Sequence, residues 1–109
     1  MRTVAEIVVE IHVPLIAATG VAEGEYPFSW IDTIEEYIVQ LDGERGEIYD
    51  DGEEFGEEYL FFVAGAPEAE LLALAAAVAV LPGVPGGVYA MVTDSTALEF
   101  GLGRRVELN

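Results

Sequence analysis

The sequence predicts a single α+β domain built from an antiparallel sheet and two helices. Three observations predict this fold class. Apolar residues alternate from Val4 to Leu15, which is typical of a β-strand. Isoleucines and a leucine recur at three- and four-residue spacing over 31–41, which indicates an amphipathic helix. An apolar run over 71–81 is too short to span a bilayer and predicts a second, largely buried helix. With 109 residues, 52% of them hydrophobic, we expect one core and one domain over residues 1–109.

The first predicted strand has one apolar face and one more polar face. The apolar face carries Ile7, Val9, Ile11, Val13 and Leu15, and the other carries Glu6, Val8, Glu10 and His12. We therefore expect a half-buried strand with its polar face toward solvent. The segment 16–28 that follows contains two glycines and a proline and shows no period, so it is expected to be a long loop.

Both predicted helices have sequence signals at their ends. Ser29 and Asp32 are each a suitable N-cap for the first helix, because each is followed three residues later by an acidic side chain. Gly43 is the expected stop of that helix. Pro67 suits the first turn of the second helix, which we expect over 66–81.

The remaining apolar segments read as strands. Segments 47–50 and 59–64 are expected to form a hairpin joined by the acidic connection DGEEFGEE, and 88–93 to form a further strand. A short last strand over 104–108 is expected at an edge of the sheet. The order β-α-β-β-α-β, with this extra edge strand, is the ferredoxin-like arrangement, in which two helices cover one face of an antiparallel sheet and the other face stays open.

The charge balance restricts the class of partner. The chain has 21 acidic residues, four arginines and no lysine, and its formal net charge is -17. Such a surface repels nucleic acid and anionic membranes, so we expect neither as a partner and favour a basic protein. Solubility and adaptation to high salt are two other origins of the same acidity. Glutamates interrupt the N-terminal apolar run, which is unlike a secretory signal, so we expect a cytoplasmic protein.

Few residues suit catalysis or metal binding. The chain has no cysteine, and His12 is its one histidine, whereas a zinc site usually needs a second histidine or a cysteine. We therefore expect no catalytic residue, no metal and no cofactor, with His12 a strand histidine on a polar face. The enzymatic alternative is a proton relay that pairs His12 with Glu6 or Glu10.

Acidic and aromatic residues are concentrated in the same region. Fourteen of the 21 acidic residues and nine of the eleven aromatic residues fall between Glu23 and Phe62. One interpretation places Trp30, Phe61 and Phe62 in the core and the acids in solvent. The other exposes some aromatics among the carboxylates, as anchors for a basic partner. The aromatics that this second interpretation considers are Tyr26, Trp30, Tyr49, Phe55 and Tyr59. The candidate partner-binding residues are Tyr49, Asp50, Asp51, Glu53, Glu54, Phe55, Glu57 and Glu58.

One stretch carries a family resemblance. The stretch GEIYDDGEEFGEEYLFFVAGAPEAELLAL, followed by a Gly/Pro turn, VYAMVTD and a closing RRVEL, resembles small bacterial ferredoxin-like proteins found as immunity proteins beside polymorphic toxins. The resemblance implies a non-catalytic inhibitor that occludes a cognate basic toxin, with the acids of 42–58 in place of a polyanion. The alternative hypothesis is a small-molecule-binding regulatory or sensor module, with a homodimer as its assembly and the loop 16–28 as its lid.

Overall fold

The chain folds into a five-stranded antiparallel sheet and two helices. The computed structural model describes residues 7–16, 28–40, 47–94 and 103–108. Its elements are β1 (Ile7–Pro14), α1 (Trp30–Gln40), β2 (Glu47–Phe55), β3 (Glu58–Ala64), α2 (Glu68–Ala79), β4 (Tyr89–Asp94) and β5 (Arg104–Glu107). The strand order is β2-β3-β1-β4-β5, and every neighbouring pair is antiparallel. The α+β class is therefore confirmed, and the architecture is compatible with the ferredoxin-like type.

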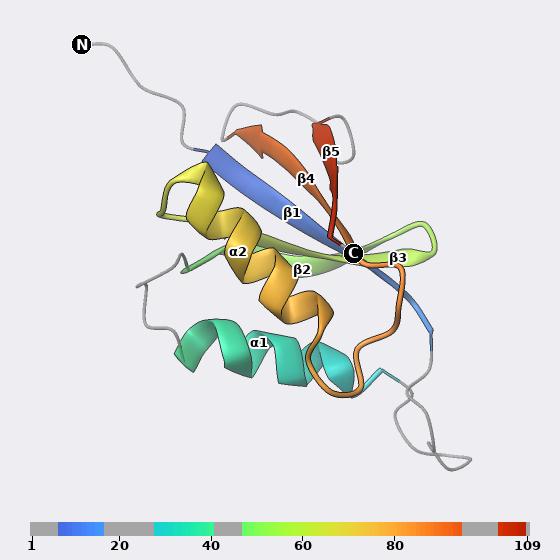
Figure 1. Cartoon of the computed structure of the whole chain (residues 1–109). Helices are drawn as coiled ribbons and strands as arrows, with labels where there is room; N and C mark the ends of the chain where they lie inside the picture. The colour runs from blue at the N-terminus through green and yellow to red at the C-terminus, as the bar shows by residue number, and fades with distance from the viewer. Residues whose placement is uncertain (1–6, 17–27, 41–46, 95–102, 109) are drawn as a thin grey trace, which may run out of the picture.

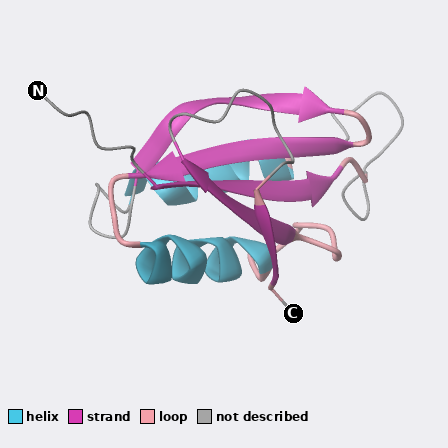
Figure 2. Ribbon diagram, turned by 90° about the horizontal axis from the view of Figure 1, so that it is seen from above, coloured by secondary structure: helices cyan, strands magenta, loops and turns pink. Residues whose placement is uncertain are grey.

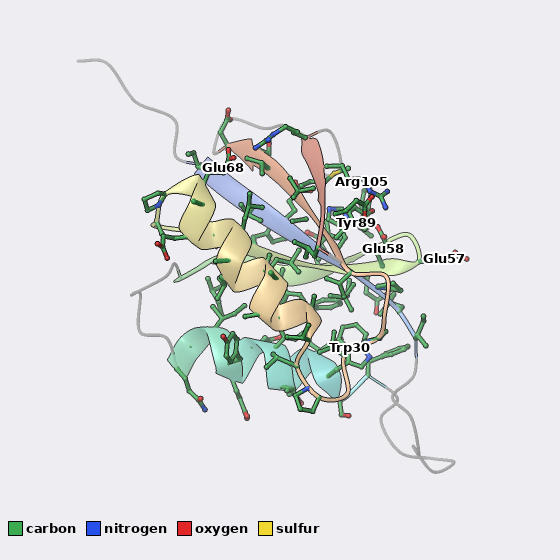
Figure 3. The ribbon with its side chains drawn as sticks, viewed as in Figure 1. Trp30, Glu57, Glu58, Glu68, Tyr89 and Arg105 are labelled. Carbon is green, nitrogen blue, oxygen red and sulfur yellow. The ribbon has the colours of Figure 1, made fainter. Side chains whose placement is uncertain are left out.

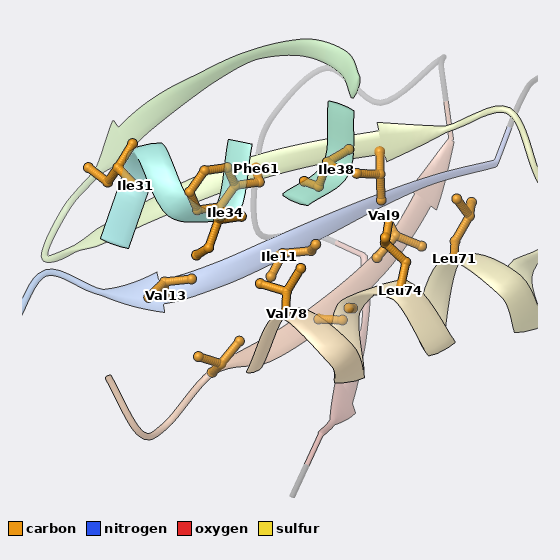
Figure 4. Close-up of a cluster of buried hydrophobic side chains, with 14 of the residues drawn as sticks. Val9, Ile11, Val13, Ile31, Ile34, Ile38, Phe61, Leu71, Leu74 and Val78 are labelled. Atoms are coloured by element: carbon orange, nitrogen blue, oxygen red, sulfur yellow. The ribbon is translucent and has the colours of Figure 1, made fainter. Parts of the chain in front are cut away.

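Both helices pack on the same face of the sheet (Figure 1). The core between them and the sheet contains the apolar face of β1, as its alternation predicts, together with one side of each helix (Figure 4). Its fully buried members include Val9, Ile11, Val13, Trp30, Ile34, Ile38, Phe61, Val63, Leu71, Leu74 and Val78. Burial of each large apolar side chain contributes about 1.5–3 kcal/mol, so this layer is the main source of stability. No helix in the described segments is both long and apolar enough to cross a membrane.

Helix α1 begins where the sequence predicts. The Thr33 amide donates a hydrogen bond to the Ser29 carbonyl at 3.3 Å, which starts the helix directly after Ser29. The Trp30 indole N–H donates to the Ile16 carbonyl at 2.9 Å and so joins the first turn of α1 to the end of β1. The predicted loop between these ends (residues 17–27) and the predicted stop at Gly43 lie outside the described residues.

The β2–β3 hairpin is longer and tighter than the sequence indicates. The prediction that β2 ends at Asp50 was wrong, because the strand continues to Phe55 and the turn is only Gly56 and Glu57. Gly56 has a φ of +65°, a left-handed conformation that glycine adopts without steric cost. The polar stretch becomes strand because it pairs with the apolar strand β3, through a register with irregularities between Ile48 and Glu53.

The second face of the sheet, away from the helices, is not open along its inner strands. The prediction of a solvent-facing polar side of β1 was wrong: Glu10 and His12 are 2% and 1% exposed. Leu60 lies opposite His12 and Phe62 opposite Glu10 on the neighbouring strand β3. Val8, Leu60, Phe62 and Ala64 form a second buried cluster. On this face the Tyr89 ring stacks on His12 with the ring centroids 4.7 Å apart, and the large apolar side chains of β3 lie beside Glu10 and His12. Figure 2 shows the helices on the opposite side.

Leu74→Ala should lower the free energy of unfolding by about 2–5 kcal/mol, because it leaves a cavity between α2 and the sheet. Leu74 is 1% exposed in the core. The matched control Val39→Ala removes apolar atoms from a side chain that is 66% exposed, so it should change stability by about 0.5 kcal/mol or less. Urea unfolding measures both values, and equal losses for the two variants would contradict the placement of the core.

Candidate functional site

Two features of the structure are candidates for function, and they share one residue. The first is the acidic hairpin, defined as β2, the turn and β3 (residues 47–64). The second is the histidine cluster, defined as Glu10, His12, Glu58, Tyr89 and Arg105, which lies on the second face of the sheet. Glu58 belongs to both features, because it is the first residue of β3 and its carboxylate contacts His12.

The acidic hairpin exposes carboxylates on both of its faces. Glu53, Glu54 and Glu57 are exposed, and the Phe55 ring among them is 44% exposed. Glu53 pairs with Leu60 and so faces away from the helices, while its neighbour Glu54 faces the other way. Figure 3 shows Glu57 at the tip of the hairpin. A partner that contacts this tip would therefore meet carboxylates from either side.

The other aromatic and acidic residues predicted for partner binding differ in their exposure. The Tyr26 residue and the side chains of Tyr49, Asp50 and Asp51 lie outside what the structure describes. Of the aromatics that the second interpretation considers, Trp30 is 1% exposed and Tyr59 is partly buried against the core, so neither is a fully exposed anchor. The alternative placement of Trp30, Phe61 and Phe62 in the core is confirmed. Among the described candidates, Phe55 is therefore the aromatic residue that is exposed beside acids.

Tyr59 is held inward by a close approach to the neighbouring strand. A Cβ atom added to Gly52 would lie 2.5 Å from Cε1 of the Tyr59 ring. Any larger residue at position 52 would require this ring to shift, and the ring also lies 5.0 Å from the Phe61 ring between centroids. Gly52 in the acidic stretch therefore has a packing role beside Tyr59, whose place on the helix-covered face follows from its pairing with Val13.

The histidine cluster is centred on two short contacts. Nε2 of His12 lies 3.0 Å from Oε1 of Glu10, and Nδ1 lies 3.0 Å from Oε1 of Glu58. A neutral imidazole has a single N–H, so with both carboxyl groups ionised both contacts are hydrogen bonds only if His12 is an imidazolium. The geometry therefore favours a positively charged ring between two negative charges, at a position that is almost completely buried.

The pKa values of the cluster agree with this protonation state. Burial alone would lower the pKa of His12, but the hydrogen bonds and charges of Glu10 and Glu58 outweigh burial and raise it above its ordinary value. Burial, together with the hydrogen bond to Glu58, raises the pKa of Tyr89 to about 12. Around neutral pH the Tyr89 hydroxyl is thus a neutral donor.

An aromatic and a guanidinium extend the cluster across the sheet. The Tyr89 ring stacks on His12 with centroids 4.7 Å apart, and its hydroxyl donates to Oε1 of Glu58 at 2.9 Å. Cζ of Arg105 lies 3.8 Å from the centroid of the Tyr89 ring, a cation–π contact. Tyr89, Glu58 and Arg105 lie close together in Figure 3. The cluster therefore links β1, β3, β4 and β5 side by side.

This arrangement suits charge compensation and proton exchange better than metal binding. Glu10 and Glu58 contact opposite nitrogens of one ring, so the three groups do not converge on a single point. Within the described residues, no set of three acidic, histidine or cysteine side chains could hold a metal ion. Glu58, which is 26% exposed, is the carboxylate through which a proton of His12 can exchange with solvent.

The sequence predicted the contact of His12 with Glu10 but not its contact with Glu58. The enzymatic alternative pairs His12 with Glu10 or Glu6, and the structure places Glu10 beside His12, as expected for residues two apart on one strand. Glu6 lies outside the described residues. The contact with Glu58 was missed because the two residues are 46 positions apart and only the register of β1 with β3 brings them together.

His12 should titrate above the ordinary histidine pKa, and Glu10→Gln and Glu58→Gln should each lower its pKa. Each substitution removes a negative charge 3.0 Å from a ring nitrogen. Because the chain has one histidine, its imidazole resonances can be followed by NMR without ambiguity. Glu57→Gln, at the exposed turn, is the matched control and should leave the titration unchanged. A wild-type pKa below the ordinary value would contradict the charged ring.

The free energy of unfolding should fall as the pH rises through the folded-state pKa of His12. That pKa is raised, so the stabilising effect is complete below the ordinary histidine pKa near 6.5 and is lost above the folded-state value. Between the two values the slope approaches about -1.4 kcal/mol per pH unit, because only the folded state keeps the proton. Urea unfolding of the wild type and of His12→Gln over this range measures the effect. The variant should lack this slope. Below the ordinary histidine pKa its free energy of unfolding should be about 3 kcal/mol lower than that of the wild type. Parallel pH profiles for the two proteins would contradict a charged His12 in the folded state.

Comparison with known proteins assigns no family to this chain. A scan against protein-family models, a search of curated proteins and a search of solved structures all found no match. The basis for a functional proposal is therefore the geometry of the acidic hairpin and the histidine cluster.

Proposed function

We propose that this chain is a non-catalytic binding protein with a ferredoxin-like fold, and that its acidic hairpin engages a basic protein partner. The observation that carries the proposal is the group of exposed carboxylates around a partly exposed aromatic ring at an edge of the sheet. These residues are Glu53, Glu54 and Glu57 around Phe55. An immunity-type inhibitor, which works by occupying a basic toxin, is the binding mode that fits this group best.

The charge of the hairpin favours rapid association with a cation. Strand β2 has the sequence EIYDDGEEF, with five acidic residues and no basic residue, and the turn adds Glu57. Clustered charge of one sign raises the rate of encounter with an oppositely charged partner, and salt screens this effect. Exposed ion pairs contribute little affinity individually, so charge alone does not explain a long-lived complex.

Phe55 supplies the contact that charge does not. Aromatic side chains that become buried at the centre of an interface contribute much of the binding energy, and surrounding polar residues exclude water from them. Phe55 pairs with Glu58 directly before the turn, so its ring lies close to the tip of the hairpin. An apolar ring between carboxylates at the tip of the hairpin suits a basic cleft that otherwise accepts phosphates.

Glu58 has a different role from the other acids of the hairpin. Its carboxylate accepts hydrogen bonds from the Tyr89 hydroxyl and, in the imidazolium state, from His12, so much of its charge is compensated within the chain. The histidine cluster therefore anchors the hairpin directly beside its turn, at the first residue of β3. Charge changes that test partner binding should spare Glu58, because they would also disturb the sheet.

The triple variant Glu53→Gln/Glu54→Gln/Glu57→Gln should slow association with a basic partner about tenfold or more at low salt, and less at high salt. The product of the neighbouring gene is the first partner to titrate, by surface plasmon resonance at two salt concentrations. The control Glu35→Gln/Glu36→Gln/Glu70→Gln removes the same charge from the two helices and should have a smaller effect. Phe55→Ala should instead speed dissociation.

Three results would overturn the proposal. The first is an absence of binding to that product at low salt, and the second is binding that salt leaves unchanged. The third is an equal loss of association rate in the hairpin and helix variants, since net charge alone would then explain the rate. Circular dichroism and thermal unfolding would show whether each variant is folded.

A further inference from the structure

The two edges of the sheet differ in charge. At one edge, β2 has five acidic residues and no basic residue. At the other edge, the sequence of β5 is RRVE, with two of the four arginines of the chain and one glutamate. An edge strand presents backbone N–H and C=O groups to which another strand can pair. Two copies of β2 would repel each other, whereas two copies of β5 need not.

We propose that the chain forms a symmetric homodimer in which β5 pairs antiparallel with β5 of a second copy. In an antiparallel pair, directly opposite residues lie on the same face of the sheet. A two-fold axis through Val106 places Arg105 opposite the second copy's Glu107, and Glu107 opposite the second copy's Arg105. Opposite charges directly across two strands stabilise the pair. The symmetric register is therefore complementary in charge at both positions.

The pairing of β5 within the chain places these side chains on the correct face. Arg105 lies opposite Met91 and Glu107 opposite Tyr89, so both project from the face away from the helices. Arg105 and Glu107 are 53% and 66% exposed. The Tyr89 ring supports the guanidinium, whose Nε donates to Glu107 at 2.8 Å. The N–H groups of its two Nη atoms are further donors, available for a second carboxylate.

Distance reduces the repulsion between two copies of so acidic a chain. Three strands separate β5 from β2 in the order β2-β3-β1-β4-β5. At about 4.8 Å between strands, the acidic edge is about 19 Å from the proposed seam. The Debye length at physiological ionic strength is about 8 Å, so these charges are largely screened from the seam. The dimer would carry its two acidic hairpins at its far ends, where both remain accessible to partners.

A charge-swap experiment on the full chain tests the homodimer. Sedimentation equilibrium at physiological salt, with protein up to about 1 mM, should give a mass that approaches twice 11.7 kDa. Glu107→Arg places two arginines opposite each other, so it should weaken self-association about tenfold or more. Arg105→Glu/Glu107→Arg restores opposite charges at both positions and should restore the dimer. Glu36→Arg, an equal charge change on α1, should leave the dimer intact.

Each alternative outcome overturns the proposal. A mass of one chain over the whole concentration range shows that no such dimer forms. A dimer that Glu107→Arg does not weaken shows that the copies meet at another surface. Failure of the double variant to restore association, when its thermal unfolding matches that of the wild type, shows that charge pairing at these positions does not hold the copies together. None of these results depends on whether the acidic hairpin binds a basic partner.

Discussion

The contacts of the buried His12 ring with the carboxyl groups of Glu10 and Glu58 are the interaction on which the second face of the sheet depends. Glu10 and His12 lie on the central strand, opposite Phe62 and Leu60, where ionised groups are costly without partners of opposite charge. Each ring nitrogen lies 3.0 Å from a carboxylate oxygen, so an imidazolium at this position compensates both charges. Loss of its proton would bring a ring nitrogen and a carboxylate oxygen together as two acceptors. The protonation state of His12 therefore contributes to the stability of this layer.

The same cluster connects the two edges of the sheet that have functional proposals. Glu58 is the first residue of β3 and holds the turn end of the acidic hairpin through His12 and Tyr89. Toward the other edge of the sheet, Arg105 of the edge strand β5 contacts the Tyr89 ring. The acidic edge and the more basic edge are thus attached to one polar centre, while the helix-covered core supplies most of the stability. This division leaves the charged edges available for binding.

The sequence predicted most elements because their signals are local. Alternation in β1 and the spacing of isoleucines in α1 each mark one buried face. The length of β2 was not predictable in this way, because it depends on pairing with β3 and not on its own polar residues. The burial of His12 was missed for a similar reason: β3 is apolar on both faces, so its sequence does not show that Leu60 lies beside His12 on the face away from the helices. The contact between His12 and Glu58 depends on the register of β1 with β3, which no local sequence pattern predicts.

The most direct test of this account is the protonation of the His12 ring in the folded wild-type chain at neutral pH. Nitrogen-15 NMR of the single histidine distinguishes an imidazolium, in which Nδ1 and Nε2 have similar shifts, from a neutral tautomer, in which the two differ widely. We expect protons on both ring nitrogens, each donated to a carboxylate. A neutral ring with one protonated nitrogen would contradict this expectation, because one of the two carboxylate contacts would then lack the ring proton that holds the cluster together.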